Sequence, residues 1–287
     1  MGRFAYVNGR FVPYGQAVVH IEDRGYQLAD AVYEVWSLFD GKLADAEGHF
    51  LRLERSLSEL RIAMPMSRRA LTLVLREAIR RNRVKDGLLY LQVSRGVAPR
   101  EHVFPSGETP PSLVITVKSL DRAAVEAKAA KGVHVVTTPE NRWGRCDIKS
   151  VGLLPNVLAK QKAKEAGAAE AWFVDDLGFV TEGASSSAWI VDAEGRLRTR
   201  DTNANILRGV TRNTLLQVIA DEGLEVDERP FTPAEATAAR EAFITGAGTL
   251  VLPVISVDGR KVGDGAPGPL ATKLRRLYIE RARAGAV

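Results

Sequence analysis

Lys149 lies in the segment Cys146-Asp147-Ile148-Lys149-Ser150, between an apolar residue and a short hydroxyl residue. In such a setting an amine can be desolvated and kept neutral, which makes it a nucleophile toward an aldehyde. The segment alone is weak support, because most lysines in proteins are solvated surface charges. The chemistry that it indicates is covalent capture of a carbonyl compound.

A second segment, Val180-Thr181-Glu182-Gly183, follows about thirty residues later and runs into Ser185-Ser186-Ser187. An acid at the start of such a turn can keep a pyridine nitrogen protonated, so that the ring withdraws electrons from a bound substrate carbon. Thr-Glu-Gly by itself is also a common strand end. The ordered pair indicates pyridoxal 5'-phosphate, with Lys149 as the catalytic Schiff-base residue and proton shuttle and Glu182 as the partner of the ring nitrogen.

Three further segments accompany this pair: Asp23-Arg24-Gly25-Tyr26-Gln27, Arg95-Gly96 with Arg100-Glu101-His102, and Ile206-Leu207-Arg208-Gly209-Val210-Thr211-Arg212. With them the chain resembles the fold-type IV aminotransferases over nearly its whole length, and most closely the D-amino acid transaminases. The resemblance implies an α/β (α+β) fold, with a small N-terminal domain over residues 1–120 and a larger, cofactor-binding pseudo-barrel domain over residues 121–287. It also implies ping-pong transfer of an amino group from a D-amino acid to a 2-oxo acid through pyridoxamine phosphate.

The cofactor's phosphate needs hydrogen-bond donors. Val210 and Thr211 open an apolar-periodic helix, and backbone amides at a helix N-terminus bind anions. The resemblance adds Leu207, Ser185 and Ser186 as cofactor-binding residues. An ordinary helix start at Gly209 would give the same local sequence.

The resemblance also assigns Arg52, from the first long helix, to the phosphate. The alternative is a surface arginine that pairs with Glu54 or Glu59.

Some positions depart from the family pattern. Ala247 stands where many members have a threonine that binds the phosphate, so Thr249 or a water molecule would have to replace that bond. Ser187 replaces a usual asparagine, and Leu28-Ala29-Asp30-Ala31 replaces a motif that is commonly richer in aromatic residues and glycine. These changes concern details of the pocket and leave the cofactor prediction intact.

Arg100 and His102 match the Arg-x-His element that grips the substrate carboxylate in D-amino acid transaminases, together with a tyrosine matched here by Tyr33. Arginine offers a planar fork of donors to a carboxylate. In the family this loop reaches in from a neighbouring subunit, which implies a homodimer. The alternative is an ordinary exposed loop, flanked by Pro99 and Pro105.

Three other functions stay open at this point. A branched-chain L-amino acid aminotransferase would share everything except the carboxylate-binding pair. A lyase of the aminodeoxychorismate type would use the same Lys149 and Glu182 but eliminate rather than transfer. A cofactor-binding carrier without turnover is disfavoured by the intact Lys149 and Glu182.

Composition excludes several other classes. The 287 residues carry a formal net charge of +5, from 40 basic and 35 acidic side chains, which is too small an excess to indicate nucleic-acid binding. The histidines show no metal-ligand spacing, and no apolar run approaches the ~20 residues of a membrane span. With the single cysteine Cys146 no intrachain disulfide can form, so a cytoplasmic protein is expected.

Periodicity and turn residues predict the elements. Asn8-Gly9 predicts a hairpin between Ala5–Val7 and Arg10–Val12. Further strands are expected over 32–39, 88–94, 113–118, 133–137, 170–174, 179–181, 188–191, 197–199, 242–245 and 254–257. Helices are expected over 50–60, 71–79 after a cap at Ser67, and then 123–130, 156–165, 212–222, 233–240 and 270–282.

Overall fold

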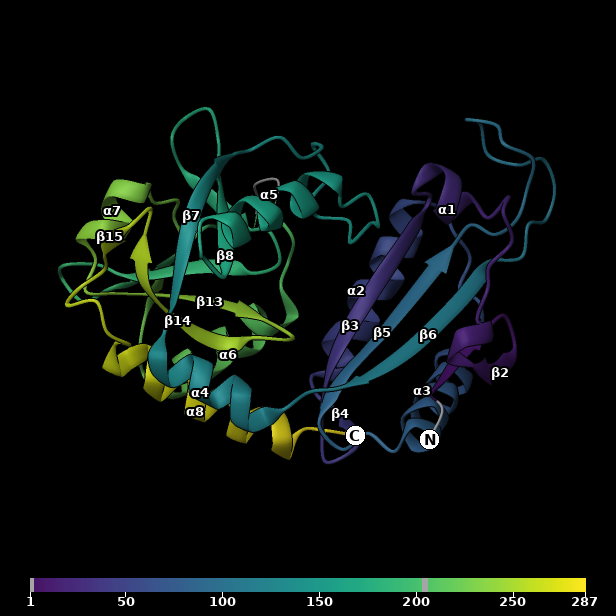
Figure 1. Cartoon of the computed structure of the whole chain (residues 1–287), viewed down its shortest axis with the longest axis horizontal. Helices are drawn as coiled ribbons and strands as arrows, with labels where there is room; N and C mark the ends of the chain where they lie inside the picture. The colour runs from purple at the N-terminus through teal and green to yellow at the C-terminus, as the bar shows by residue number, and fades with distance from the viewer. Residues whose placement is uncertain (1–2, 203–205) are drawn as a thin grey trace. The chain divides into compact units, whose positions relative to one another are not determined.

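The computed structural model describes residues 3–202 and 206–287 and divides the chain into two compact units. Unit 1 contains residues 1–121, 148–152 and 285–287, and unit 2 contains residues 122–147 and 153–284. Both units combine helices and strands, as expected for an α/β (α+β) fold (Figure 1).

Unit 1 begins with the predicted hairpin of β1 (Phe4–Val7) and β2 (Arg10–Pro13). Asn8 and Gly9 take the positive φ angles of 44° and 93° that a type I′ turn needs. The hairpin joins a six-stranded sheet of order β2-β1-β6-β5-β3-β4, formed with β3 (Ala31–Phe39), β4 (Lys42–Leu43), β5 (Gly87–Ser94) and β6 (Ser112–Ser119).

Two amphipathic helices, α2 (Ala46–Glu59) and α3 (Arg68–Asn82), pack on this sheet (Figure 1). As predicted, Ser67 caps α3, its side chain accepting a hydrogen bond from the Ala70 amide. The helices bury leucines such as Leu53 and Leu71 in the same core as Trp36 of β3. This core fixes the strand that carries Tyr33 and Glu34.

The segment 148–152 returns to unit 1 and extends along β3. Ser150 forms an isolated antiparallel bridge with Val32, and the Tyr33 amide donates to the Lys149 carbonyl at 3.0 Å. Ile148 is buried in the same core as the two helices. The backbone of Lys149 is therefore fixed on the edge of β3.

Unit 2 is built on a curled sheet of order β12-β11-β10-β13-β14-β7-β8-β9, with β15 paired to β14 (Figure 1). Its strands are β7 (Val133–Pro139), β8 (Glu170–Val174), β9 (Val180–Gly183), β10 (Ser187–Val191), β11 (Leu197–Thr199), β12 (Val226–Asp227), β13 (Glu241–Gly246), β14 (Leu250–Val257) and β15 (Arg260–Lys261). Pairing of β9 with β8 and of β10 with β13 fixes the two strands on either side of the turn after Glu182.

The helices of unit 2 are α4 (Arg122–Lys131), α5 (Leu154–Glu165), α6 (Val210–Asp221), α7 (Pro233–Ala238) and α8 (Pro269–Ala284). Arg275 of α8 pairs with Glu126 of α4 at 2.8 Å, and the two helices lie side by side (Figure 1). Each of these helices was predicted, with ends that shift by up to two residues.

Sequence patterns missed some short elements, namely the 3-10 turn η1 (Tyr14–Gln16), helix α1 (Arg24–Leu28) and strands β4, β12 and β15. They also placed the starts of α2 and β14 four residues too late. Among the described residues there is no helix long and apolar enough to cross a membrane, and no cluster of three side chains suited to a metal ion.

Candidate active site

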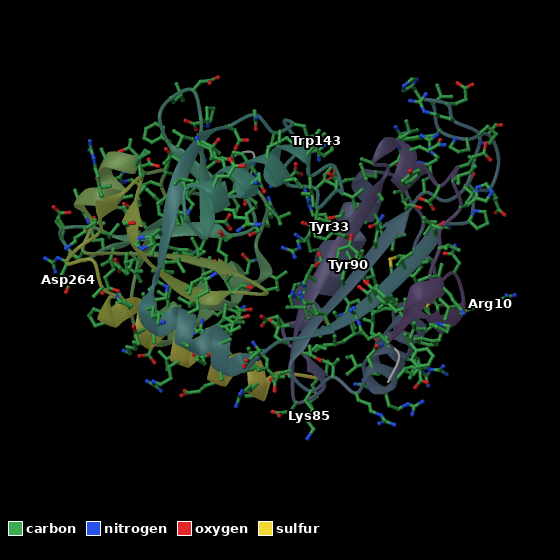
Figure 2. All side chains as sticks on the ribbon, viewed as in Figure 1. Arg10, Tyr33, Lys85, Tyr90, Trp143 and Asp264 are labelled. Carbon is green, nitrogen blue, oxygen red and sulfur yellow. The ribbon has the colours of Figure 1, made fainter. Side chains whose placement is uncertain are left out.

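The Lys149 amine lies over an aromatic face in unit 1. Its Nζ is 4.1 Å from the centre of the Tyr33 ring. That ring stacks on Tyr90 of the neighbouring strand β5, with centroids 5.6 Å apart (Figure 2). Burial raises the pKa of Tyr90 to about 12, and its hydroxyl donates to Gln92 at 2.7 Å. The half-buried Lys149 is thus held by its backbone on β3 and by a cation–π contact at its tip.

Arg52 pairs with Glu34 of β3. Its Nε and Nη2 donate to the two oxygens of Glu34 at 2.7 and 2.8 Å, and His49 contacts the same carboxylate at 2.7 Å. Glu34 is fully buried. Burial alone would raise its pKa, but the charge and hydrogen bonds of Arg52 lower it to about 2. No sequence motif pointed to this buried cluster, in which Glu34 is 15 residues from His49 and 18 from Arg52.

Glu182 lies near the end of β9 in unit 2, where two donors reach its Oε1. Arg142 donates through Nη1 at 2.5 Å and the Leu207 amide donates at 3.2 Å. Arg142 also forms a two-pronged pair with Glu140, at 2.9 and 2.6 Å. The Arg142 side chain is only 7 % exposed, so its charge faces Glu182 in a poorly solvated environment. Such a neighbour favours the ionised carboxylate that a pyridinium partner requires.

Ser185 and Ser186 direct their hydroxyls to a residue that the sequence did not single out. Both donate to Oε2 of the buried Glu170, at 2.7 and 3.0 Å. The Ser185 amide points to the same oxygen at 3.3 Å. Glu170 therefore shapes the turn that follows Glu182.

At the N-terminus of α6, neighbouring atoms can approach the backbone closely. Its N-cap is Gly209, and no described side chain caps the helix. A Cβ on Gly209 would lie 2.9 Å from Oγ of Ser187, so only glycine fits without a shift. The first helical hydrogen bond runs from the Asn213 amide to Gly209, which leaves the preceding amides of Val210 and Thr211 outside the helical ladder.

Leu207 connects this helix to Glu182. Its amide bonds the carboxylate, and three residues later the helix begins. Three residues span at most about 11 Å, so the carboxylate and the helix N-terminus lie within reach of one small molecule. Val210 and Thr211 are both buried, so a ligand there would meet amides rather than bulk water.

These residue types fit pyridoxal 5'-phosphate. Free helix amides such as those of α6 and a cation such as Arg52 are groups that can bind a phosphate, a carboxylate such as Glu182 suits a pyridinium nitrogen, and Lys149 carries an amine. The hydroxyl of Thr249 turns inward instead, since its Oγ1 lies 3.5 Å from the Gly246 carbonyl in its own turn. Ala247 contributes no hydroxyl either.

Arg100 and His102 lie on the exposed loop between β5 and β6. Neither side chain has a hydrogen bond or ion pair with the residues that the structure describes. Arg100 and His102 belong to unit 1, as do Tyr33, Lys149 and Arg52. The other proposed site residues belong to unit 2, namely Glu182, Ser185, Ser186, Leu207, Val210 and Thr211. Within each unit the structure adds partners that sequence reasoning missed, namely Glu34, His49, Arg142 and Glu170.

Cys146 has no nucleophilic role here. Its thiol is buried and donates to the Trp143 carbonyl at 3.1 Å. Burial raises its pKa to about 11, so it stays protonated at neutral pH.

The model of the Amino-transferase class IV family matches residues 31–257, a range that contains almost every residue discussed above. The chain belongs to the class IV aminotransferases. Among curated relatives, this aminotransferase is 41 % identical over 268 residues to a D-alanine aminotransferase of Bacillus licheniformis, covering 93 % of each chain.

Solved structures confirm the fold. A branched-chain amino acid aminotransferase of Escherichia coli matches 98 % of this chain and 95 % of its own with a TM-score of 0.89, at 23 % identity. A second branched-chain enzyme, from the organism abbreviated T.th. and solved with pyridoxamine 5'-phosphate, matches 98 % of this chain and 94 % of its own with a TM-score of 0.88, at 26 % identity. Structural similarity at this level of sequence identity defines the fold. It does not identify the amino donor.

Proposed function

We propose that this aminotransferase uses pyridoxal 5'-phosphate to move the amino group of a D-amino acid to a 2-oxo acid. The observation that carries the proposal is the 41 % identity to a D-alanine aminotransferase over nearly the full length of both chains. Identity to the branched-chain enzymes is much lower, at 23 and 26 %. The solved branched-chain structure with pyridoxamine 5'-phosphate supports the choice of cofactor.

When bound, the cofactor supplies an aldehyde and an electron-withdrawing ring. Lys149 would hold that aldehyde and, once displaced by substrate, would move the proton of the substrate α-carbon. The Tyr33 ring, 4.1 Å from Nζ, limits where the amine can travel. Glu182, braced by Arg142 and the Leu207 amide, would keep the proton on the ring nitrogen.

The phosphate would be bound by the amides of Val210 and Thr211 and by Arg52. Arg52 is already oriented by two bonds to Glu34, so less conformational freedom is lost when an anion binds. Ser185 and Ser186 would line the same part of the site through their backbone, since Glu170 holds their hydroxyls.

Arg100 and His102 would bind the substrate carboxylate with Tyr33. A substrate carboxylate held by Arg100 and His102 fixes which Cα–H bond faces Lys149, and this selects the D-enantiomer. Both side chains are exposed in the single chain, so the proposal includes a homodimer in which this loop serves the site of the partner subunit.

Exposed apolar side chains support an interface on unit 1. Val18, Ile21 and Tyr26 are 75 to 77 % exposed, and Val103 is 72 % exposed. The two segments that carry them run side by side, because Asp23 bridges Val97 and the Arg24 amide donates to Gly96. A soluble monomer rarely exposes such a patch. The cytoplasm is the proposed location, given a single, buried cysteine.

The test is a half-reaction assay with paired enantiomers. D-alanine or D-glutamate should convert the yellow holoenzyme to its pyridoxamine form much faster than L-alanine, L-glutamate or L-leucine. Arg100→Ala should lower kcat/KM for every amino acid donor by a factor of tens to several hundred, on the order of 2 to 4 kcal/mol for a lost ion pair.

A faster reaction with L-leucine or L-valine than with any D-amino acid would favour a branched-chain enzyme instead. That alternative draws its support from the branched-chain neighbours in the structural comparison. Unchanged kcat and KM in Arg100→Ala would remove the proposed carboxylate contact.

A further inference from the structure

The loop that carries Arg100 and His102 is held to the rest of unit 1 at one hydrogen-bonded point. Nη1 of Arg24 donates to the carbonyl of Glu101 at 2.7 Å, and Glu101 lies between the two side chains proposed to bind substrate. From Pro99 to Pro111 this is the one hydrogen bond that the loop makes with the described residues. The conformation of Arg100-Glu101-His102 therefore depends strongly on Arg24.

Arg24 is itself fixed deep in the unit, at only 2 % exposure. Its Nε donates to Oδ2 of Asp30 at 2.8 Å. Its backbone amide donates to Gly96 at 2.9 Å, so both ends of the residue are anchored before the side chain reaches the loop. The Arg24 side chain therefore links Asp30 to Glu101 in a fixed position.

Arg95 holds Asp30 from the other side. Its Nε and Nη2 donate to the two oxygens of Asp30, at 2.7 and 3.0 Å. It also donates to the carbonyls of Leu60 and Arg61, at 2.7 and 3.1 Å. Burial would raise the pKa of Asp30, but Arg95 and Arg24 together lower it. Asp30 thus stays ionised and keeps both arginines in place.

Phe104 provides the second contact of the loop. Its ring lies 3.7 Å from the guanidinium of Arg95 and 5.0 Å from that of Arg61. Nearly half of Phe104 is exposed, so the ring rests on the arginines without being enclosed. The loop is therefore held at Glu101 and at Phe104, on either side of His102.

We propose that Arg24, held by Asp30 and Arg95, is the positioning residue that sets the substrate-carboxylate loop. This inference rests on the proposed function, because it assigns Arg24 to the presentation of Arg100 and His102. A carboxylate needs several donors at fixed positions, so a loosely held loop would bind it weakly. Arg24 itself touches neither substrate nor cofactor in this scheme.

Arginine is required at position 24 because two acceptors must be bridged. One planar guanidinium reaches Asp30 with Nε and Glu101 with Nη1, whereas a lysine ammonium is a single point on a flexible stem. Arg24→Lys should keep the pairing with Asp30 and lose the bond to the loop. The charge of the cluster would be unchanged.

The experiment compares Arg24→Lys with the wild type and with a matched control, Arg80→Lys, on the exposed face of α3. Arg24→Lys should raise KM for D-alanine roughly tenfold or more, with kcat at saturation within about twofold. Trypsin cleavage after Arg100 should become faster in the cofactor-free protein as well. Arg80→Lys should change neither property.

A folded Arg24→Lys variant with unchanged KM and unchanged trypsin cleavage after Arg100 would overturn the proposal. A fall in thermal stability alone would mean that Arg24 only supports the fold. If wild-type protein does not transaminate D-amino acids, the proposed function fails, and the cleavage rates still decide whether Arg24 holds the loop. Phe104→Ala, on an exposed side chain, gives a second variant; it should raise KM and the rate of loop cleavage.

Discussion

Replacement of Glu34 by glutamine should destabilise the protein far more than the same change at a partly exposed carboxylate with a similar pKa. Glu34 is fully buried and contacts both Arg52 and His49. The Glu34→Gln variant keeps the size of the side chain but removes the negative charge that faces Arg52, whose side chain is 10 % exposed. Breaking a buried pair from one side costs about 3 to 5 kcal/mol.

The lowered pKa of Glu34 indicates a loss of stability of similar magnitude. A fall from 4.5 to about 2 corresponds to roughly 3 kcal/mol of stability at neutral pH. Because the folded-state pKa of Glu34 is lowered, this stability is present above pH 4.5 and is lost as the pH falls toward 2. For 287 residues unfolding together, roughly 3 kcal/mol is worth about 5 °C in Tm.

Thermal unfolding followed by circular dichroism, at pH 7 and down to pH 3, measures both effects. The matched control is Glu77→Gln on α3, since the pKa of Glu77 is also lowered to about 2, by hydrogen bonds from Arg80 and Arg81, but 29 % of its side chain is exposed. That control should leave Tm nearly unchanged. Equal Tm values for Glu34→Gln and wild type at pH 7, or equal losses for the two variants, would refute the reasoning.

Three further outcomes are expected. Borohydride treatment of the yellow holoenzyme should fix the cofactor on the peptide that contains Lys149, and mass spectrometry placing it on Lys160 or Lys162 would remove that assignment. Glu182→Gln should retain cofactor while kcat falls by orders of magnitude, because a neutral amide cannot hold the ring proton; a near-normal kcat would mean that another group does so. Gly209→Ala should cost about 1 to 3 kcal/mol through the 2.9 Å approach to Ser187 and should weaken cofactor retention on dialysis. Ser187→Ala in the same chain should restore much of both losses, and no recovery would contradict the steric explanation.

Long periodic elements could be predicted from the sequence, whereas short ones could not. Helix α3 shows apolar spacing and a capping serine, and the hairpin has Asn8-Gly9 at its turn. Strands β4, β12 and β15 have only two residues each, too few to show alternation. Their existence depends on pairing with neighbours that sequence patterns do not specify.

Strand β14 shows why one boundary was wrong. Pro253 lies inside the strand, opposite Phe243 of β13, although proline usually interrupts a sheet. On its other side β14 pairs with β7 only from Val254 onward. Pro253 therefore needs no donor on that side, and the strand starts at Leu250 rather than Val254.

The residues proposed to carry the chemistry were found from local motifs, but their partners were not. Lys149 and Glu182 lie in recognisable segments, while Arg142 is 40 residues from Glu182 and has no motif of its own. Likewise Glu34 looks like one more residue of a strand until β3 and α2 pack together. Partners of this kind become visible only when the tertiary structure is known.

The return of residues 148–152 to β3 has a consequence for the order in which the protein is made. The Val32–Ser150 bridge joins two segments that are more than a hundred residues apart in the sequence. When residue 121 leaves the ribosome, β1 to β6 can already pair, but the edge of β3 lacks the segment that bears Lys149. A chain that ends at residue 121 would therefore form a sheet that lacks Lys149. In the full chain, unit 1 is completed only after α4 and β7 have been synthesised.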